Sequence, residues 1–125
     1  SGIGKTTVLN MIAGLRTPDK AYIKINDRLI TDTEHKVNLK IQNRKIGYLF
    51  QDYQLFPNMT VYKNITFMSK PSVHIDDLMD RLNIHHLKEQ YPSTLSGGES
   101  QRVALARTLS TKPDLILLKD FAFFF

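Results

Sequence analysis

The sequence predicts an α/β fold, in which helices and strands alternate along the chain and pack in layers. Two stretches carry this prediction. Near the start, the glycines of SGIGKTT lead directly into a segment with apolar residues at helical spacing. Near the end, Pro113 precedes the continuous apolar run DLILL, which is typical of a strand buried in a parallel sheet. Shorter helical and strand patterns alternate between these two stretches, as the layered fold requires.

The first half of the chain is expected to hold one helix and three strands. The segment KTTVLNMIAGL predicts a short helix that ends near Gly14. The segments AYIKIN and RLIT predict a hairpin that turns at Asn26 and Asp27. The apolar segment KIGYLF predicts the third strand.

The second half is expected to be mostly helical before its final strand. The segment QDYQLFPNMTVYKNI predicts a loop with a proline breaker, followed by an apolar turn or the start of a helix. Farther along, SGGESQRVALARTL predicts a stronger helix. Between these segments, one helical face is predicted from Ile75, Leu78, Met79 and Leu82.

Length and composition limit the possible function classes. The 125 residues fit one domain, and 42% apolar content is typical of a folded protein. The net charge of +5 comes from scattered residues, which favours a solvated surface and no nucleic-acid partner. The absence of cysteine excludes a disulfide scaffold and a thiolate metal site. No apolar run approaches the roughly 20 residues of a membrane span.

The opening stretch predicts a phosphate-binding loop. Glycine lets the backbone approach an anion closely, and the N-terminus of the following helix attracts negative charge. A lysine would reach the terminal phosphates, and the next hydroxyl would bind Mg²⁺. The alternative is a glycine-rich turn before a helix, and the leading glycine of G-x-x-x-x-G-K-[ST] is lacking. The predicted nucleotide-binding residues are Ser1, Gly2, Gly4, Lys5, Thr6 and Thr7, with Thr6 also a metal ligand.

A second anion site is predicted at the start of the SGGESQRVALARTL helix. Ser96 and Glu99 have the S-x-x-E spacing of a capping box, so this helix should begin at Gly97 or Gly98. Ser96, Gly97 and Gly98 would present a hydroxyl and backbone N–H groups at the positive helix end. The alternative is an ordinary capped helix that binds no ligand.

These motifs together resemble those of ABC-type ATPases. The run LSGGESQR, with G-x-G-K-T-T upstream, is similar to the signature of that family, and IGYLFQDYQLFPNMTVYKNI resembles its Q-loop segment. The resemblance covers nearly the whole chain. It implies a P-loop NTPase core with a small helical subdomain, present as an incomplete ATP-binding domain. Residues of about 1–66 and 103–125 would form the core, and those of about 67–102 the helical part.

The same resemblance implies the cofactors, partners and location. ATP and Mg²⁺ would bind, with Gln51 near the metal and the attacking water. Two copies would pair head to tail, so that each signature closes over ATP held by the other copy. The segment from Asp52 to Val61 would meet an integral membrane permease, on the cytoplasmic side of the membrane. The segment from Arg44 to Ile65 is most similar to ATPase subunits of importers for molybdate and related oxyanions.

The chain departs from the family where a catalytic Asp-Glu pair should follow the last strand. Without a gap, Lys119 replaces the metal-organising aspartate and Asp120 replaces the catalytic glutamate. With one inserted residue, Asp120 serves the metal and Phe121 replaces the glutamate. Asp120 is therefore the predicted catalytic carboxylate beside Gln51. Two hypotheses remain open, an importer ATPase subunit and a catalytically inactive nucleotide-binding fragment.

Overall fold

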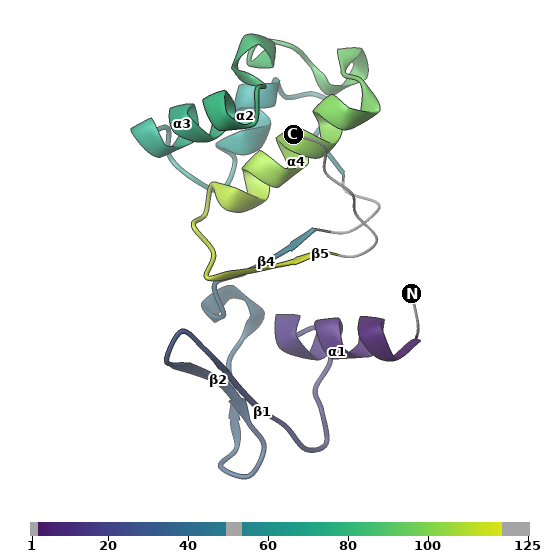
Figure 1. Ribbon diagram of the computed structural model, residues 1–125, viewed down its shortest axis with the longest axis vertical. Helices are drawn as coiled ribbons and strands as arrows, with labels where there is room; N and C mark the ends of the chain where they lie inside the picture. The colour runs from purple at the N-terminus through teal and green to yellow at the C-terminus, as the bar shows by residue number, and fades with distance from the viewer. Residues whose placement is uncertain (1–2, 50–53, 119–125) are drawn as a thin grey trace.

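The computed structural model describes residues 3–49 and 54–118, and every structural statement refers to these residues (Figure 1). Predictions that concern Ser1, Gly2, Gln51, Lys119 and Asp120 lie outside the described residues. The described elements mix helices and strands, as the α/β class predicts, but they do not alternate strictly, because four strands follow α1 and three helices precede β5. In chain order they are α1 (Ile3–Ala13), β1 (Tyr22–Ile25), β2 (Arg28–Asp32), β3 (Val37–Asn38), β4 (Ile46–Leu49), α2 (Val61–Ile65), α3 (Val73–Arg81), α4 (Gly97–Leu109) and β5 (Leu115–Leu118).

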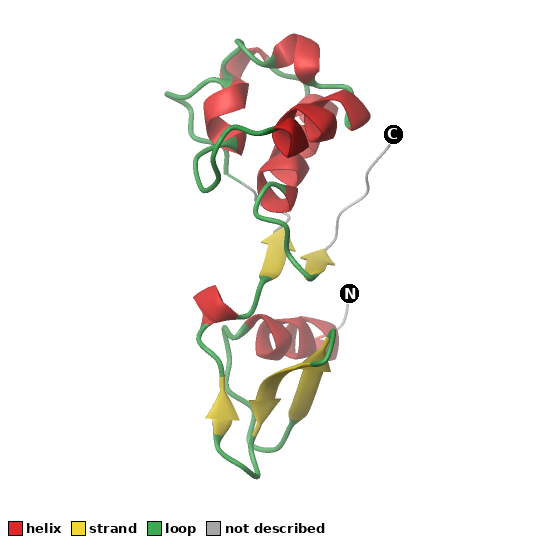
Figure 2. Ribbon diagram, turned by 90° about the vertical axis from the view of Figure 1, so that its left-hand side faces the viewer, coloured by secondary structure: helices red, strands yellow, loops and turns green. Residues whose placement is uncertain are grey.

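The elements form three tiers, which Figures 1 and 2 show from two directions. Helix α1 and the sheet β1-β2-β3 lie at one end, and the helices α2, α3 and α4 lie at the other. The strand pair β4–β5 lies between them. In the described part, no helix has both the length and the apolar character of a membrane span.

The antiparallel sheet confirms the predicted hairpin. Strands β1 and β2 pair through a two-residue turn, in which Asn26 has φ 49° and Asp27 has φ 64°. These two residue types tolerate left-handed backbone better than most, and this turn matches the twist of paired strands. Strand β3 adds to β2 and was not predicted, because its two residues are too short for a period-2 pattern.

The pair β4–β5 is parallel, as the final apolar run predicts. Its register runs from Ile46 opposite Leu115 to Leu49 opposite Leu118. The expected burial on both faces is only partial, since Leu117 is buried but Leu118 is 45% exposed. Among the described residues β5 has a single strand neighbour, β4, which leaves its other edge without a paired strand.

The main hydrophobic core lies among the helices α2, α3 and α4 and strand β4. The four residues predicted on one face of the α3 segment are all buried. Strand β4 approaches α4 closely at Gly47, where a Cβ atom would lie 2.5 Å from Thr108 Cγ2. The predicted boundaries between the nucleotide-binding core and the helical part, near residues 67 and 102, stay a prediction. The core residues are Leu49, Val61, Ile65, Ile75, Met79, Leu82, Ile84, Leu87, Val103, Ala104, Leu105 and Ala106.

Candidate functional site

The predicted phosphate-binding residues that the structure describes lie in the first turns of α1. Gly4 and Lys5 are exposed, and Thr6 and Thr7 are half-buried. A Cβ atom placed on Gly4 would meet nothing within 4 Å, so the space around it is open. The first turn has no acidic residue, so no carboxylate opposes the partial positive charge at this helix end. An open helix start with an exposed lysine fits a phosphate group.

The C-terminus of α1 is closed by a Schellman motif. Gly14 adopts φ 89°, in the left-handed region that favours glycine. The Leu15 N–H donates to the Asn10 carbonyl at 2.8 Å, and the Gly14 N–H donates to the Met11 carbonyl at 3.3 Å. A Cβ atom on Gly14 would also lie 2.7 Å from Nε of Arg44. The end of α1 is therefore fixed by backbone geometry and by a neighbouring side chain.

Arg44 anchors this helix end to the segment that enters β4. Its side chain is only 2% exposed, and its Nη1 donates to the carbonyls of Met11 (3.1 Å) and Ile12 (2.9 Å). Its Nε donates to the Leu39 carbonyl at 2.9 Å, and its Nη2 donates to Asn38 Oδ1 at 2.6 Å. Burial lowers the pKa of Arg44, since water can no longer solvate the charge. No sequence pattern indicates this role, because Arg44 stands among other scattered charged residues.

The strand pair brings two chain segments to the same sheet edge. Leu49 and Leu118 end β4 and β5 and lie opposite each other in parallel register. Gln51 and Asp120 each follow these ends by two residues in the sequence. The carboxyl ends of parallel strands are the usual position of ligand sites in α/β folds. Both residues lie outside the described part, so their catalytic roles stay predictions.

The capping box at the start of α4 is present as predicted. Ser96 Oγ accepts from the Glu99 N–H at 3.1 Å, and Glu99 Oε1 accepts from the Ser96 N–H at 2.9 Å. The hydrogen bond from the Ser96 backbone holds the pKa of the Glu99 carboxyl below its ordinary value. The ionised carboxylate therefore supports the helix fully above the ordinary glutamate pKa. This support is lost as the pH falls through the lowered value.

Removal of the serine cap has a measurable expected cost. We expect Ser96→Ala to lower the free energy of unfolding by about 1 kcal/mol, because the Glu99 N–H loses its acceptor. Urea denaturation monitored by circular dichroism measures the change. The matched control is Ser93→Ala, an exposed serine three residues earlier. An equal loss of stability in both variants would contradict the capping role.

The two predicted anion sites lie on separate elements and are not brought together. Helix α4 begins at the end of the helical tier that is remote from α1, as both views show (Figures 1 and 2). A Cβ atom on Gly97 would meet nothing within 4 Å, so the start of α4 is also open. In Figure 1 the two helix starts lie toward the same side of the molecule but far apart along its long axis.

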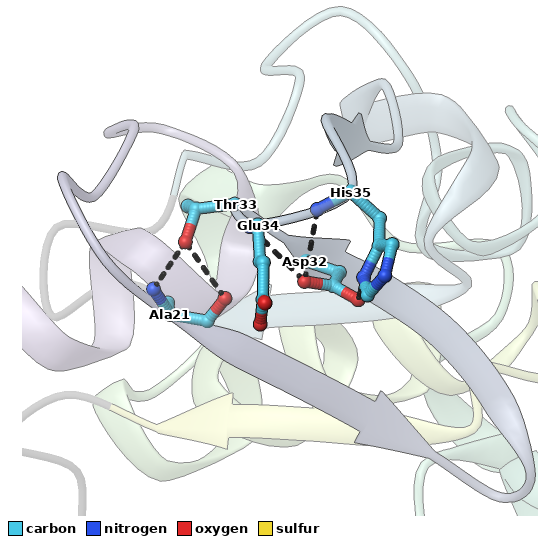
Figure 3. Close-up of polar contacts among 5 residues, drawn as sticks. All are labelled: Ala21, Asp32, Thr33, Glu34 and His35. Carbon is cyan, nitrogen blue, oxygen red and sulfur yellow. Dashed lines mark hydrogen bonds and ion pairs between the residues drawn. The ribbon is translucent and has the colours of Figure 1, made fainter.

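The hairpin end carries an acidic turn with a structural role (Figure 3). Asp32 Oδ1 accepts from the N–H groups of Glu34 (3.1 Å) and His35 (3.3 Å), and Asp32 Oδ2 lies 2.7 Å from His35 Nδ1. The contact with the His35 side chain lowers the pKa of Asp32. Thr33 Oγ1 accepts from the Ala21 N–H at 2.9 Å and closes the loop. Within residues 3–49 and 54–118, no three histidine, cysteine, aspartate or glutamate side chains lie close enough together to hold a metal ion.

A pocket of about 340 Å³ lies between β4 and the C-terminal half of α4. The ring centres of Phe56 and Phe67 lie 4.7 Å apart, and the Arg107 guanidinium lies 5.2 Å from the Phe56 ring centre. Arg107 is the one formally charged residue that lines this pocket. Its Nη1 is buried and has no hydrogen-bond partner among the described residues. We call this the aromatic pocket, and its lining residues are Gly47, Tyr48, Gln54, Phe56, Phe67, Met68, Arg107, Thr108 and Thr111.

Curated proteins of known name are similar to this chain in sequence. The chain is 47% identical over 123 residues to the molybdenum import ATP-binding protein ModC of Haemophilus influenzae, covering 96% of the chain and 35% of that protein. It is 46% identical over 122 residues to the ModC protein of Vibrio parahaemolyticus, covering 96% of the chain and 33% of that protein. The chain therefore spans about a third of the length of these curated relatives.

A solved structure has a similar fold to this chain. CbiO1 from Clostridium perfringens, part of the ABC transporter complex cbiONQ, matches with a TM-score of 0.75 and 31% identity. The match covers 94% of this chain and 51% of that one. The family model described as ABC transporter matches residues 1–120. The chain belongs to the ABC transporter family and has the fold of its ATP-binding subunits.

Proposed function

We propose that this chain is the ATP-binding part of an importer for molybdate or a related oxyanion, and that it couples ATP binding and hydrolysis to transport. The observation that carries the proposal is that two open helix starts, of α1 with Lys5 and of α4 with Ser96, lie far apart along the long axis of the molecule. The cargo is inferred from the relatives named as molybdenum import ATP-binding proteins.

The described residues would divide the binding of ATP between two sites. Lys5 and the N–H groups at the start of α1 would hold the phosphates. Mg²⁺ would bind beside Thr6 and Gln51, where it would offset the charge that develops during phosphoryl transfer. Ser96, Gly97 and Gly98 would contact the phosphates of ATP held by a second copy. The remote positions of the two sites support this head-to-tail dimer.

The aromatic pocket would receive an integral membrane permease on the cytoplasmic side of the membrane. Phe56 belongs to the segment Asp52 to Val61, which resembles the permease-contacting patch of the family. Phe67 and Met68 at the pocket are 53% and 70% exposed, which is costly for large apolar side chains in water. The unpartnered Nη1 of Arg107 favours an apolar segment that also carries a hydrogen-bond acceptor.

A second candidate function is nucleotide binding without turnover. Lys119 and Asp120 stand where the family has its metal-organising aspartate and catalytic glutamate, and neither alignment keeps both carboxylates. Phosphoryl transfer depends on placed charge and an oriented water. On this hypothesis the chain binds ATP but hydrolyses it at the background rate. Steady-state turnover that disappears in Lys5→Ala would reject this candidate.

Lys5→Ala tests the proposed nucleotide site. We expect ATP binding to weaken at least about tenfold, because the lysine makes charge-assisted hydrogen bonds to phosphate. Calorimetric titration measures the affinity. Lys20→Ala is the matched control, since Lys20 is an exposed lysine in the loop after α1. No binding by the unmodified chain, or equal weakening in both variants, would refute the site.

A further inference from the structure

Asn64 is completely buried, and its side-chain amide is fully used. Its Oδ1 accepts from the Phe56 N–H at 2.7 Å. Its Nδ2 donates to the carbonyls of Phe56, Met59 and Thr60, each at 3.1 Å. The acceptor side faces an N–H group and the donor side faces carbonyls, so the network defines the orientation of the amide. One side chain therefore fixes the backbone of the loop from Phe56 to Thr60.

The same loop is fixed where it enters α2. Thr60 Oγ1 accepts from the Lys63 N–H at 3.2 Å and caps the helix. The first helical N–H group, that of Val61, donates to the Gln90 carbonyl at 2.8 Å. Asn64 lies in this short helix, so the amide connects a rigid helix to the loop before it. Fully satisfied buried polar networks of this kind specify a single geometry.

The loop presents one ring of the aromatic pocket. Asn64 bonds both the N–H and the carbonyl of Phe56, so it sets the direction in which the Phe56 side chain leaves the backbone. The centre of that ring lies 4.7 Å from the centre of the Phe67 ring and 5.2 Å from the Arg107 guanidinium. A rotation of the Phe56 backbone would separate these groups and open the pocket wall.

We propose that Asn64 is a positioning residue for partner docking, which acts by holding Phe56 as a wall of the aromatic pocket. The partner is an apolar, acceptor-bearing segment of the permease, so the inference rests on the proposed function. Aspartate has the same shape but would face three carbonyls with a carboxylate. Glutamine could make the same types of bond but is one methylene longer. Of these three residues, only asparagine fits both the distances and the donor pattern.

The first experiment compares Asn64→Asp with Asn58→Asp. Asn58 lies in the same loop but is exposed, so it receives the same chemical change without the network. The probe is the membrane permease subunit of the Haemophilus influenzae molybdenum importer, whose ATP-binding protein is 47% identical to this chain over 123 residues. The permease is held in detergent micelles, and its binding is measured by biolayer interferometry. We expect Asn64→Asp to weaken docking about tenfold and Asn58→Asp less than about twofold. ATP affinity at the Lys5 site should be unchanged in both variants.

A double-mutant cycle separates positioning from general stability. Phe56→Ala keeps both hydrogen bonds to Asn64, because these bonds use backbone atoms. In the Phe56→Ala background, Asn64→Asp should have no further effect on docking, since the ring it positions is gone. Additive losses would overturn the proposal. If Asn64→Asp does not fold, Phe56→Ala alone decides, and docking equal to that of the unmodified chain overturns the proposal.

The outcomes also distinguish this inference from the proposed function. An unmodified chain that does not bind the permease overturns the proposed docking, and with it the role of Asn64. An unmodified chain that binds, together with a folded Asn64→Asp variant of equal affinity, overturns the role of Asn64 alone. Lost protection of the Phe56 N–H from hydrogen exchange in Asn64→Asp, with docking also weakened, supports the inference.

Discussion

Replacement of Arg44 by methionine is expected to lower the free energy of unfolding by about 3 kcal/mol. The change removes four hydrogen bonds, among them those to the Met11 and Ile12 carbonyls at the end of α1, of which the Met11 carbonyl keeps the Gly14 N–H as a donor. Methionine fills much of the same volume, so the loss reports the polar contacts more than a cavity. Denaturant unfolding monitored by circular dichroism measures the difference.

Arg16→Met is the matched control for this prediction. Arg16 follows the same helix end but is exposed, so its replacement should change stability by less than about 0.5 kcal/mol. Arg44→Lys should give an intermediate loss, because one ammonium cannot reach all four acceptors. Equal stability of Arg44→Met and Arg16→Met would show that the buried guanidinium does not hold α1 in place.

Replacement of Lys119 by aspartate is expected to tighten Mg-ATP binding by about one to two powers of ten, if the ungapped alignment is correct. On that alignment the ammonium stands where the metal-organising carboxylate should be. Two unit charges at about 4 Å repel by roughly 4 kcal/mol at an effective dielectric near 20, and screening reduces this. Binding of metal-free ATP should change far less. Calorimetric titrations with and without Mg²⁺ measure both affinities.

The alternative alignment predicts a different result. If Asp120 already serves the metal, Lys119→Asp brings little gain, and equal affinities would reject the ungapped alignment. Lys112→Asp is the control for the change in net charge, because Lys112 is exposed and lies in the turn before β5. Hydrolysis should require Asp120→Glu in addition, since the shorter side chain of aspartate would not reach the attacking water.

The elements that sequence reasoning identified correctly are those with local causes. The turn at Asn26 and Asp27 follows from residues that tolerate left-handed backbone, and the capping box follows from the spacing of Ser96 and Glu99. The α3 face follows from helical periodicity. In each case the interacting groups lie within a few positions of one another, so the pattern itself contains the interaction.

The features that escaped prediction depend on contacts that the local pattern does not contain. Arg44 looks like any charged residue until the fold brings the end of α1 to it. Asn64 is a polar residue near the start of a helix that follows a loop, where the sequence alone suggests an exposed side chain. Only the fold shows that it is buried. The partial exposure of Leu118 depends on which strands flank β5. The catalytic pair stays a prediction, because Gln51 and Asp120 lie outside the described residues.

The parallel pairing of β4 with β5 has a consequence for the order in which this chain acquires its structure. Ile46 pairs with Leu115, which is 69 residues later in the chain, so β4 leaves the ribosome long before β5 has been synthesised. The Asn64 network, in contrast, joins positions no farther apart than Phe56 and Asn64 and can close early. Contacts between distant positions require the closure of long loops, which slows folding. We therefore expect the loop and α2 to form first on the nascent chain, with the unpaired edge of β4 vulnerable to aggregation until β5 arrives.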